Sequence, residues 1–161
     1  PLAIRIVEQR CNDTMSGRPF PHVVEVYADG TTYAGCGGDT ATLLTDGSWR
    51  VTELGGAPVL PSDPPTLEFA ADGALTGNGG CNRYRSTYEI TGEGLLIGPA
   101  LATRMACADP EMNTQEVNFF ARLEEITRFD LDHEDRLVLF VLDQPAIVAE
   151  PVPDDPANPP A

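Results

Sequence analysis

Short runs of alternating polar and apolar residues, separated by turn-forming residues, fill most of the chain and restrict its fold more than any other feature. In "RYRSTYEI" (83–90), one set of alternate residues is Tyr84, Ser86, Tyr88 and Ile90, and the other is Arg83, Arg85, Thr87 and Glu89. Because successive side chains of a strand point to opposite faces, we expect one face of this strand in the core and the other in water. "GSWRVTEL" (47–54) has the same pattern and is expected to form a further strand.

Three hairpins are expected from the turn residues between these runs. "HVVEVYADGTTYAGC" (22–36) and "TLEFAADGALTG" (66–77) each contain Asp-Gly, which suits the positive φ angles of a two-residue hairpin turn. "RFDLDHEDRLVLFVLD" (128–143) is expected to turn at His133–Asp135, and its second strand is apolar on both faces, as in a central or interface strand. The pattern as a whole predicts an antiparallel β protein.

One amphipathic helix is expected after Cys107, with Asp109 as its N-cap and Pro110 in its first turn. Its apolar stripe would consist of Met112, Phe119, Phe120, Leu123 and Ile126. Such a helix would lie across the open side of the sheet. From Glu150 onward, "EPVPDDPANPPA" is too polar and proline-rich to form a core, and residues 150–161 are predicted to be a disordered tail.

The charge of the chain excludes several kinds of partner. Ten arginines, no lysines and 25 acidic residues give a formal net charge of −15. This charge would repel nucleic acids and anionic bilayers. The absence of lysine fits either the codon usage of a GC-rich genome or an adaptation to high salt, and the sequence does not separate the two. No apolar run has the length of a transmembrane segment.

The four cysteines are Cys11, Cys36, Cys81 and Cys107, and none of them forms a C-x-x-C motif. His22 and His133 are far from metal-ligand spacing, so a zinc site is not expected. Isolated cysteines in even number predict two disulfides and export to an oxidising compartment. Of the three possible connectivities we favour Cys11–Cys36 and Cys81–Cys107, because each closes a loop of about 25 residues worth about 3 kcal/mol. Four buried free thiols in a cytosolic protein would be the alternative.

The glycine-rich stretch "GNGGCN" (77–82) raises the question of a phosphate site. Dinucleotide-binding loops need a third glycine and a following helix, whereas here Asn82 takes that position and the next run alternates as a strand. We therefore expect no cofactor. The glycines instead predict a bulge or tight corner that brings Cys81 into disulfide reach, at which Asn82 would tolerate a left-handed conformation.

Two motifs within this part of the chain resemble a known family. G-x-G-G-C-N-R-Y at 77–84 and L-A-T-R-M-A-C at 101–107 are similar to motifs of the META domain, the domain of the bacterial heat-shock protein J-like envelope lipoproteins. The resemblance covers about residues 49–148. It implies a mainly β (α+β) fold, an antiparallel, partly open β-barrel with one packed α-helix. It also implies an envelope location, periplasmic or outer-membrane-anchored, and no established catalytic residues.

The first part of the chain lies outside this resemblance. "CNDTMSGRPFPHVVEVYADGTTYAGCGG" (11–38) resembles the end of a second bacterial envelope domain, through C-x-D-x-M-S, F-P and G-C-G. We therefore predict three parts: a β-hairpin segment (1–46), a META-like domain (47–149) and the proline-rich tail (150–161). A lipid anchor, if there is one, would have to lie upstream of Pro1.

Several clusters could carry chemistry, and each has a stronger structural interpretation. No serine lies in a G-x-S-x-G motif. Asp130, Asp132 and Glu134 could hold Ca²⁺, but they lack the spacing of a calcium loop, so a solvated acidic hairpin is favoured. A candidate binding surface flanks the second cysteine pair and consists of Asn82, Arg83, Tyr84, Thr103, Arg104 and Met105. For these residues too a structural role is favoured over docking.

The function expected from the sequence is a non-enzymatic domain of the bacterial cell envelope, without cofactor or metal. It would bind a partner protein or a lipid-like ligand in stress response or envelope maintenance. The alternative is a secreted inhibitor of a hydrolase of the protease or lysozyme type. A protruding loop would favour the inhibitor, and an apolar cavity between sheet and helix would favour ligand binding.

Overall fold

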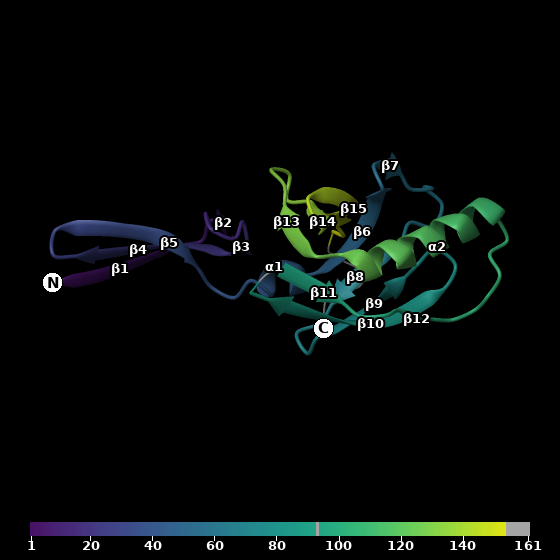
Figure 1. The fold of residues 1–161 in the computed structure, drawn as a ribbon, viewed down its shortest axis with the longest axis horizontal. Coiled ribbons are helices and arrows are strands. Elements are labelled where there is room, and N and C mark those ends of the chain that lie inside the picture. Colours follow the sequence, from purple (N-terminus) through teal and green to yellow (C-terminus); the bar gives the residue numbers. More distant parts are fainter. Residues whose placement is uncertain (93, 154–161) are drawn as a thin grey trace.

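The computed structural model describes residues 1–92 and 94–153, and Figure 1 shows their arrangement. The elements are β1 (Leu2–Val7), β2 (Cys11–Asn12), β3 (Pro19–Phe20), β4 (His22–Ala28), β5 (Thr31–Gly37), α1 (Thr42–Thr45), β6 (Ser48–Leu54), β7 (Ala57–Pro58), β8 (Thr66–Phe69), β9 (Ala74–Asn78), β10 (Arg83–Thr91), β11 (Gly94–Ile97), β12 (Leu101–Ala102), α2 (Pro110–Glu125), β13 (Arg128–Leu131), β14 (Leu137–Val141) and β15 (Gln144–Pro151). The prediction of a mainly β chain is confirmed.

The larger sheet is antiparallel and curls into a nearly closed barrel. Its strands follow the order β11-β10-β9-β8-β6-β15-β14-β13, and β12 and β7 pair with β10 and β6. The two edges meet at one seam, where the backbone N–H of Leu95 donates to the carbonyl of Thr127 at 2.9 Å. Gly94 permits this approach, because a Cβ there would lie 2.1 Å from the Thr127 carbonyl oxygen. The predicted partly open antiparallel barrel is therefore confirmed, with its opening at this seam.

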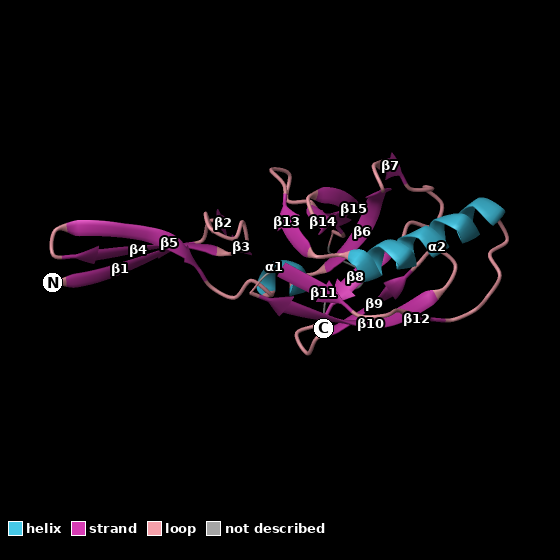
Figure 2. Ribbon diagram, viewed as in Figure 1, coloured by secondary structure: helices cyan, strands magenta, loops and turns pink. Residues whose placement is uncertain are grey.

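Helix α2 packs into the barrel and completes its core (Figure 2). The Asp109 carboxylate accepts a hydrogen bond from the backbone N–H of Glu111 at 2.9 Å, which confirms the predicted N-cap. Of the predicted apolar stripe, Phe119 and Leu123 are fully buried and Phe120 is half-buried. The buried core residues of the barrel and helix are Leu44, Trp49, Val51, Leu67, Phe69, Leu75, Tyr84, Leu95, Ile97, Phe119, Leu123, Ile126, Phe129, Leu137, Leu139, Ala146, Ile147 and Ala149.

The first 37 residues form two small antiparallel sheets, β2-β3 and a three-stranded sheet with the order β1-β4-β5, which extends away from the barrel (Figure 1). Its hairpin turns at Asp29 and Gly30, which have φ angles of 50° and 77°, as predicted. Arg10 connects this part to the barrel, donating to the Asp135 carboxylate and to the Asp132 carbonyl at 2.7 Å each. The predicted division between residues 46 and 47 stays a prediction.

Both predicted disulfides are confirmed. Cys11–Cys36 joins β2 to β5 with a Cα–Cα distance of 5.4 Å. Cys81–Cys107 joins the glycine-rich loop to the segment before α2 with a Cα–Cα distance of 5.6 Å.

The structure differs from the sequence-based expectations at three places. The first is helix α1, which was not predicted. The second is the turn at Asp72–Gly73, which was expected to have a positive φ at both residues. Gly73 alone has a positive φ, and its backbone N–H donates to the Ala70 carbonyl. The third is the start of the tail, because β15 continues to Pro151, and Glu150 and Pro151 pair with Arg50 and Trp49 of β6. After β15, the backbone N–H of Val152 still donates to the Ser48 carbonyl at 2.9 Å, and residues 154–161 of the predicted tail lie outside the described residues.

The last hairpin agrees with its prediction. It joins β13 to β14 through a turn in which Asp135 has a φ of 59°, and β14 lies between β13 and β15 as a central strand. Within the part of the chain that the structure describes, no helix has both the length and the apolar character needed to cross a membrane.

Candidate functional site

The glycine-rich loop that follows β9 binds a carboxylate of the protein itself. Glu116 lies on α2, is 6% exposed, and points at this loop. Its Oε2 accepts hydrogen bonds from the backbone N–H groups of Cys81 at 3.0 Å and Asn82 at 2.7 Å. Its Oε1 accepts from Nδ2 of Asn82 at 2.6 Å. Successive backbone N–H groups that converge on one point form an anion-binding concavity, and here Glu116 fills it.

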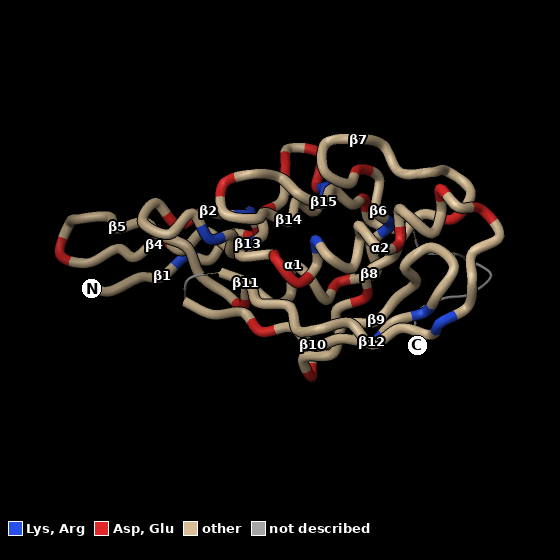
Figure 3. The backbone as a smooth tube through the Cα atoms, turned by 45° about the vertical axis from the view of Figure 1, so that its right-hand side comes forward, with Lys and Arg blue, Asp and Glu red and all other residues tan. Residues whose placement is uncertain are grey.

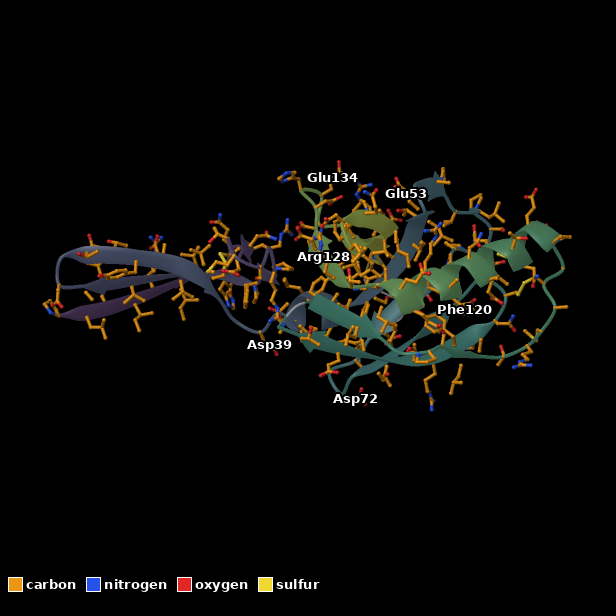
Figure 4. All side chains as sticks on the ribbon, viewed as in Figure 1. Asp39, Glu53, Asp72, Phe120, Arg128 and Glu134 are labelled. Carbon is orange, nitrogen blue, oxygen red and sulfur yellow. A yellow bond between two sulfur atoms is a disulfide. The ribbon has the colours of Figure 1, made fainter. Side chains whose placement is uncertain are left out.

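The glycines of the loop allow it to lie directly against α2. A Cβ at Gly79 would come within 2.5 Å of the Phe120 ring, and one at Gly80 within 3.0 Å of the Met112 sulfur. Figure 4 shows Phe120 pointing from α2 toward the strands below it. The predicted tight corner is thus present. The positive φ of the loop falls on Gly80, so the fold does not require a left-handed conformation of Asn82.

The side chain of Asn82 is buried and holds the segment that follows β12. Its Oδ1 accepts from the backbone N–H of Met105 at 2.7 Å and from the hydroxyl of Thr103 at 3.0 Å. Its Nδ2 donates to the carbonyl of Met105 at 3.0 Å. Asn82 therefore mimics a strand neighbour for Met105, and the disulfide next to it ties the same two segments covalently.

Tyr84 is a core residue. It is 4% exposed and packs edge-on against Phe119 and Phe120, with ring centroids 5.7 and 5.4 Å away. Its hydroxyl donates to the carbonyl of Thr66 at 2.7 Å. Burial raises the pKa of Tyr84 well above its ordinary value, so the phenol stays neutral.

The exposed part of the predicted surface lines an open groove between the 100–106 segment and α2. This 100–106 groove has a volume of about 510 Å³ and is lined by Asn82, Ala100, Leu101, Ala102, Thr103, Arg104, Met105, Ala106, Asn113, Glu116 and Phe120. Leu101 and Met105 are 76% and 65% exposed. The groove therefore combines exposed apolar side chains and Arg104 with a hydrogen-bonded floor made by Asn82 and Glu116.

The structure divides the six residues of the predicted surface. Asn82, Thr103, Arg104 and Met105 line the groove, whereas Arg83 and Tyr84 do not. Tyr84 is enclosed in the core and Arg83 is exposed on the opposite face of β10. Arg83, Arg85 and Arg104 make no ion pair with another described residue. Whether this surface binds a partner stays a prediction.

Glu116 is the residue of this site that the sequence-based analysis missed. It lies four residues after Met112 and three before Phe119, so it interrupts the apolar stripe of α2. A carboxylate within an apolar stripe must find hydrogen-bond donors when the stripe is buried. The position of Glu116 within the apolar stripe was therefore the sequence feature that could have indicated its burial.

The acidic hairpin between β13 and β14 is satisfied by its own neighbours. Burial alone would raise the pKa of the Asp132 carboxyl, but hydrogen bonds from the backbone N–H groups of Arg136 and Glu134, and from the Arg136 guanidinium, lower that pKa below its ordinary value. Asp130 accepts from Nδ2 of Asn12 at 3.0 Å. These contacts agree with a structural role for the hairpin. Among the described residues, Cys81, Cys107 and Glu116 have metal-ligand spacing, but the disulfide occupies both sulfurs.

A second open groove, of about 670 Å³, lies where the first sheet meets the barrel. Its lining includes Arg10, Pro21, Trp49, Asp135 and part of α1. The guanidinium of Arg10 in this groove is already engaged by Asp135 and the Asp132 carbonyl. The Arg10 guanidinium therefore stabilises the contact between the amino-terminal part of the chain and the barrel.

These features define a small disulfide-bonded β-barrel domain with one covering helix and an open groove beside the disulfide. The chain belongs to the META domain family, whose model matches residues 42–150. This confirms the resemblance and extends it to α1 at one end and by two residues of β15 at the other.

Solved structures with a similar fold share little sequence with this chain. An NMR structure of a protein from Burkholderia xenovorans has a TM-score of 0.57 and 23% identity, and the match covers 78% of this chain and 97% of that one. A second NMR structure has a TM-score of 0.51 and 23% identity, covering 66% and 88%. A duf4847 family protein from Bacteroides vulgatus has a TM-score of 0.48 and 17% identity, covering 69% and 95%. The first two show a shared fold alone. A search of curated proteins found no significant match.

Proposed function

We propose that this chain is a non-enzymatic domain of the bacterial cell envelope that binds a partner protein through the 100–106 groove, in stress response or envelope maintenance. Membership of the META domain family supports the envelope setting. The observation that carries the binding proposal is the exposure of Leu101 and Met105 beside Arg104. The backbone of this segment is fixed by two hydrogen bonds between Met105 and the buried Asn82 side chain. A preorganised segment loses little conformational entropy when it binds.

The packing of the barrel favours a protein partner over a lipid-like ligand. Between the sheet and α2, the side chains of Leu67, Leu75, Phe119, Leu123 and Leu139 are at most 2% exposed and fill the interior. An acyl chain would have to displace this core. The open groove at the surface offers instead the mixture of apolar, polar and cationic groups that is typical of protein interfaces.

A photo-crosslinking experiment in the source bacterium tests this proposal. A photoreactive phenylalanine analogue at Leu101 should give a discrete crosslinked product. The same analogue at Leu96, an exposed leucine of β11 outside the groove lining, should give none. Met105→Glu should remove the Leu101 product and fail to restore a deletion strain under envelope stress. Equal products from both positions, or full restoration by Met105→Glu, would contradict the proposal.

Export to the periplasm is part of the same proposal and rests on the two disulfides and the family. When bacterial cells are treated with a membrane-permeant alkylating reagent before lysis, all four cysteines of an exported protein should remain unmodified. Modification of the four cysteines in the native strain would place the chain in a reducing compartment. Fractionation of the same cells distinguishes a periplasmic protein from an outer-membrane-anchored one.

A hydrolase inhibitor remains the second candidate, because the β13–β14 turn projects from the barrel (Figure 4). Glu134 is exposed at its tip, and Asp132 and Arg136 brace its base. A rigid acidic turn could enter the active site of a basic hydrolase such as a lysozyme. Inhibition of lysozyme that Glu134→Arg abolishes, and that Met105→Glu leaves intact, would favour this candidate over the first.

A further inference from the structure

The sheet β1-β4-β5 has one uncovered apolar face. In the strand registers, Leu2, Ile4 and Ile6 pair with Ala28, Val26 and Val24, and Val26 and Val24 pair in turn with Tyr33 and Gly35. Paired residues of antiparallel strands point to the same side, so all of these residues share one face. Leu2, Ile4, Ile6 and Tyr33 are 68%, 62%, 65% and 60% exposed. No other described part of the molecule covers them.

The opposite face of the same sheet is polar by comparison. It carries the ion pair between Arg5 and Glu25 at 3.3 Å, the small side chains of Ala3 and Ala34, and a single largely exposed aromatic side chain, that of Tyr27 (57%). In antiparallel sheets the apolar face normally packs on a second layer about 10 Å away while the polar face meets water. The described chain contains the first layer of such a pair without the second.

The size of the face is near what a specific interface requires. If a large apolar side chain offers on the order of 200 Å², the four most exposed residues present roughly 500 Å² on one molecule. Two copies packed face to face would then bury about 1,000 Å² from these side chains, which is the lower bound for a specific interface.

The face combines a large and a bare position on one strand, as a two-fold interface can use. Tyr33 projects from β5, and Gly35 follows two residues later on the same side of that strand. A Cβ at Gly35 would meet nothing within 4 Å, so no side chain occupies the surface at this position. In a two-fold pair, the tyrosine of one copy can pack on the bare position of the other.

A membrane is a poorer occupant for this face. Membrane-docking surfaces carry lysine or arginine around their apolar centre. Arg5 is the one such residue in the three strands, and it lies on the opposite face in its ion pair with Glu25. The net charge of −15 would oppose an anionic bilayer further.

We propose that the apolar face of β1-β4-β5 is an interface at which a second copy of this chain binds, sheet on sheet, through a two-fold axis. The barrels with their 100–106 grooves lie outside this interface. This arrangement is independent of whether the groove binds a partner.

Sedimentation equilibrium of the whole oxidised chain tests the proposal over protein concentrations from about 1 µM to 1 mM, since interfaces of this size are micromolar or weaker. The molar mass should rise from 17.2 kDa to twice that value. The transition should move to lower concentration in about 0.5 M NaCl, because salt screens the repulsion between two molecules of charge −15. A mass of 17.2 kDa throughout would overturn the proposal.

Matched variants locate the interface. Ile4→Glu places a carboxylate on the apolar face and should weaken association at least tenfold. Ala3→Glu adds the same charge to the opposite face and should leave association unchanged. Gly35→Val, which a monomer tolerates because the space over Gly35 is open, should also weaken association. Intact Cys11–Cys36 in each variant verifies that the sheet has folded.

Two results would replace the dimer by another arrangement. Association that responds equally to Ile4→Glu and Ala3→Glu would rule out the face as its site. Binding of the monomer to vesicles of phosphatidylcholine, lost in Ile4→Glu, would identify a lipid surface as the occupant and overturn the proposal.

Discussion

The carboxylate of Glu116 occupies the position that a bound phosphate would take in a glycine-rich anion site. The loop at 79–82 supplies converging backbone N–H groups, as nucleotide-binding loops do, but a side chain of the same molecule accepts from them. The glycines are therefore needed for close contact with Phe120 and Met112. The same arrangement makes Glu116 and Asn82 a pair of buried polar residues that satisfy one another.

Replacing Glu116 by Gln should destabilise the fold. The amide keeps the size of the side chain, but it removes the charge that strengthens two backbone hydrogen bonds and cannot accept at both positions. We expect a loss of about 1.5–3 kcal/mol, or roughly 3–12 °C in melting temperature for a chain of this size. Thermal unfolding followed by circular dichroism measures it. Glu124→Gln on the exposed side of the same helix is the control and should melt like the parent.

Tyr84 and Arg83 are neighbours in sequence with opposite roles in the fold. Tyr84→Ala should destabilise by about 3–5 kcal/mol, because it leaves a cavity against Phe119 and Phe120 and an unpaired Thr66 carbonyl. Arg83→Ala should leave the melting temperature nearly unaltered, since its side chain is exposed. Chemical denaturation of both variants gives the two free energies of unfolding. A Tyr84→Ala variant as stable as the parent would contradict the core assignment.

At the scale of elements, strands were predictable wherever a pattern was local. β10 alternates in sequence from Arg83 to Ile90, and its more buried and more exposed faces follow that alternation over these eight residues. Asp109 and Pro110 place the start of α2 for the same reason. β7 and β12 have two residues each, which is too short for any period to show. The seam depends on Leu95 meeting Thr127, and no local pattern predicts such a distant contact.

The candidate site was predictable to a similar extent. The two motifs placed Asn82 and the 103–105 segment together, and the cysteine pairing predicted the covalent link between them. The burial of Glu116 was not predicted, because its acceptor role depends on backbone groups 34 and 35 residues earlier in the chain. Its position within the apolar stripe of α2 distinguishes it from the exposed Glu124 and Glu125, but that position does not identify the donors that Glu116 meets.

The two disulfides stabilise different elements and should be separable by experiment. Cys81→Ser/Cys107→Ser opens a loop of 26 residues in the barrel and should cost about 3 kcal/mol in the chain-entropy model. Trp49 is the one tryptophan of the chain and is buried in β6, so its fluorescence reports barrel unfolding. Cys11→Ser/Cys36→Ser should leave this transition unchanged and increase hydrogen exchange in β4 and β5 alone. Equal shifts of the Trp49 transition would show that the two sheets unfold as one unit.

At the scale of the whole molecule, the dominant property is negative charge. Acidic segments are distributed over the barrel and the first sheet, with few basic segments between them (Figure 3). Ten arginines offset only part of the 25 acidic residues. Like charges at these separations repel one another in the compact state more than in the expanded one.

Salt should therefore stabilise the protein. Between about 0.01 M and 1 M NaCl the Debye length falls from about 30 Å to 3 Å, which removes most repulsion between exposed carboxylates. At pH 7 the melting temperature should rise over this range. Near the sequence pI of about 4.2 the net charge vanishes, and the same change in salt should have little effect. A salt response of equal size at both pH values would assign the effect to apolar burial instead of charge.

The two disulfides join cysteines that are consecutive along the chain, first with second and third with fourth. During translocation through a membrane, the amino-terminal pair would emerge together before the other pair becomes accessible. An oxidase that links thiols in their order of appearance thus forms the native bonds without subsequent reshuffling. In an exported chain, forming these two bonds requires a donor of oxidising equivalents, but the pairing of these four cysteines places no demand on an isomerase.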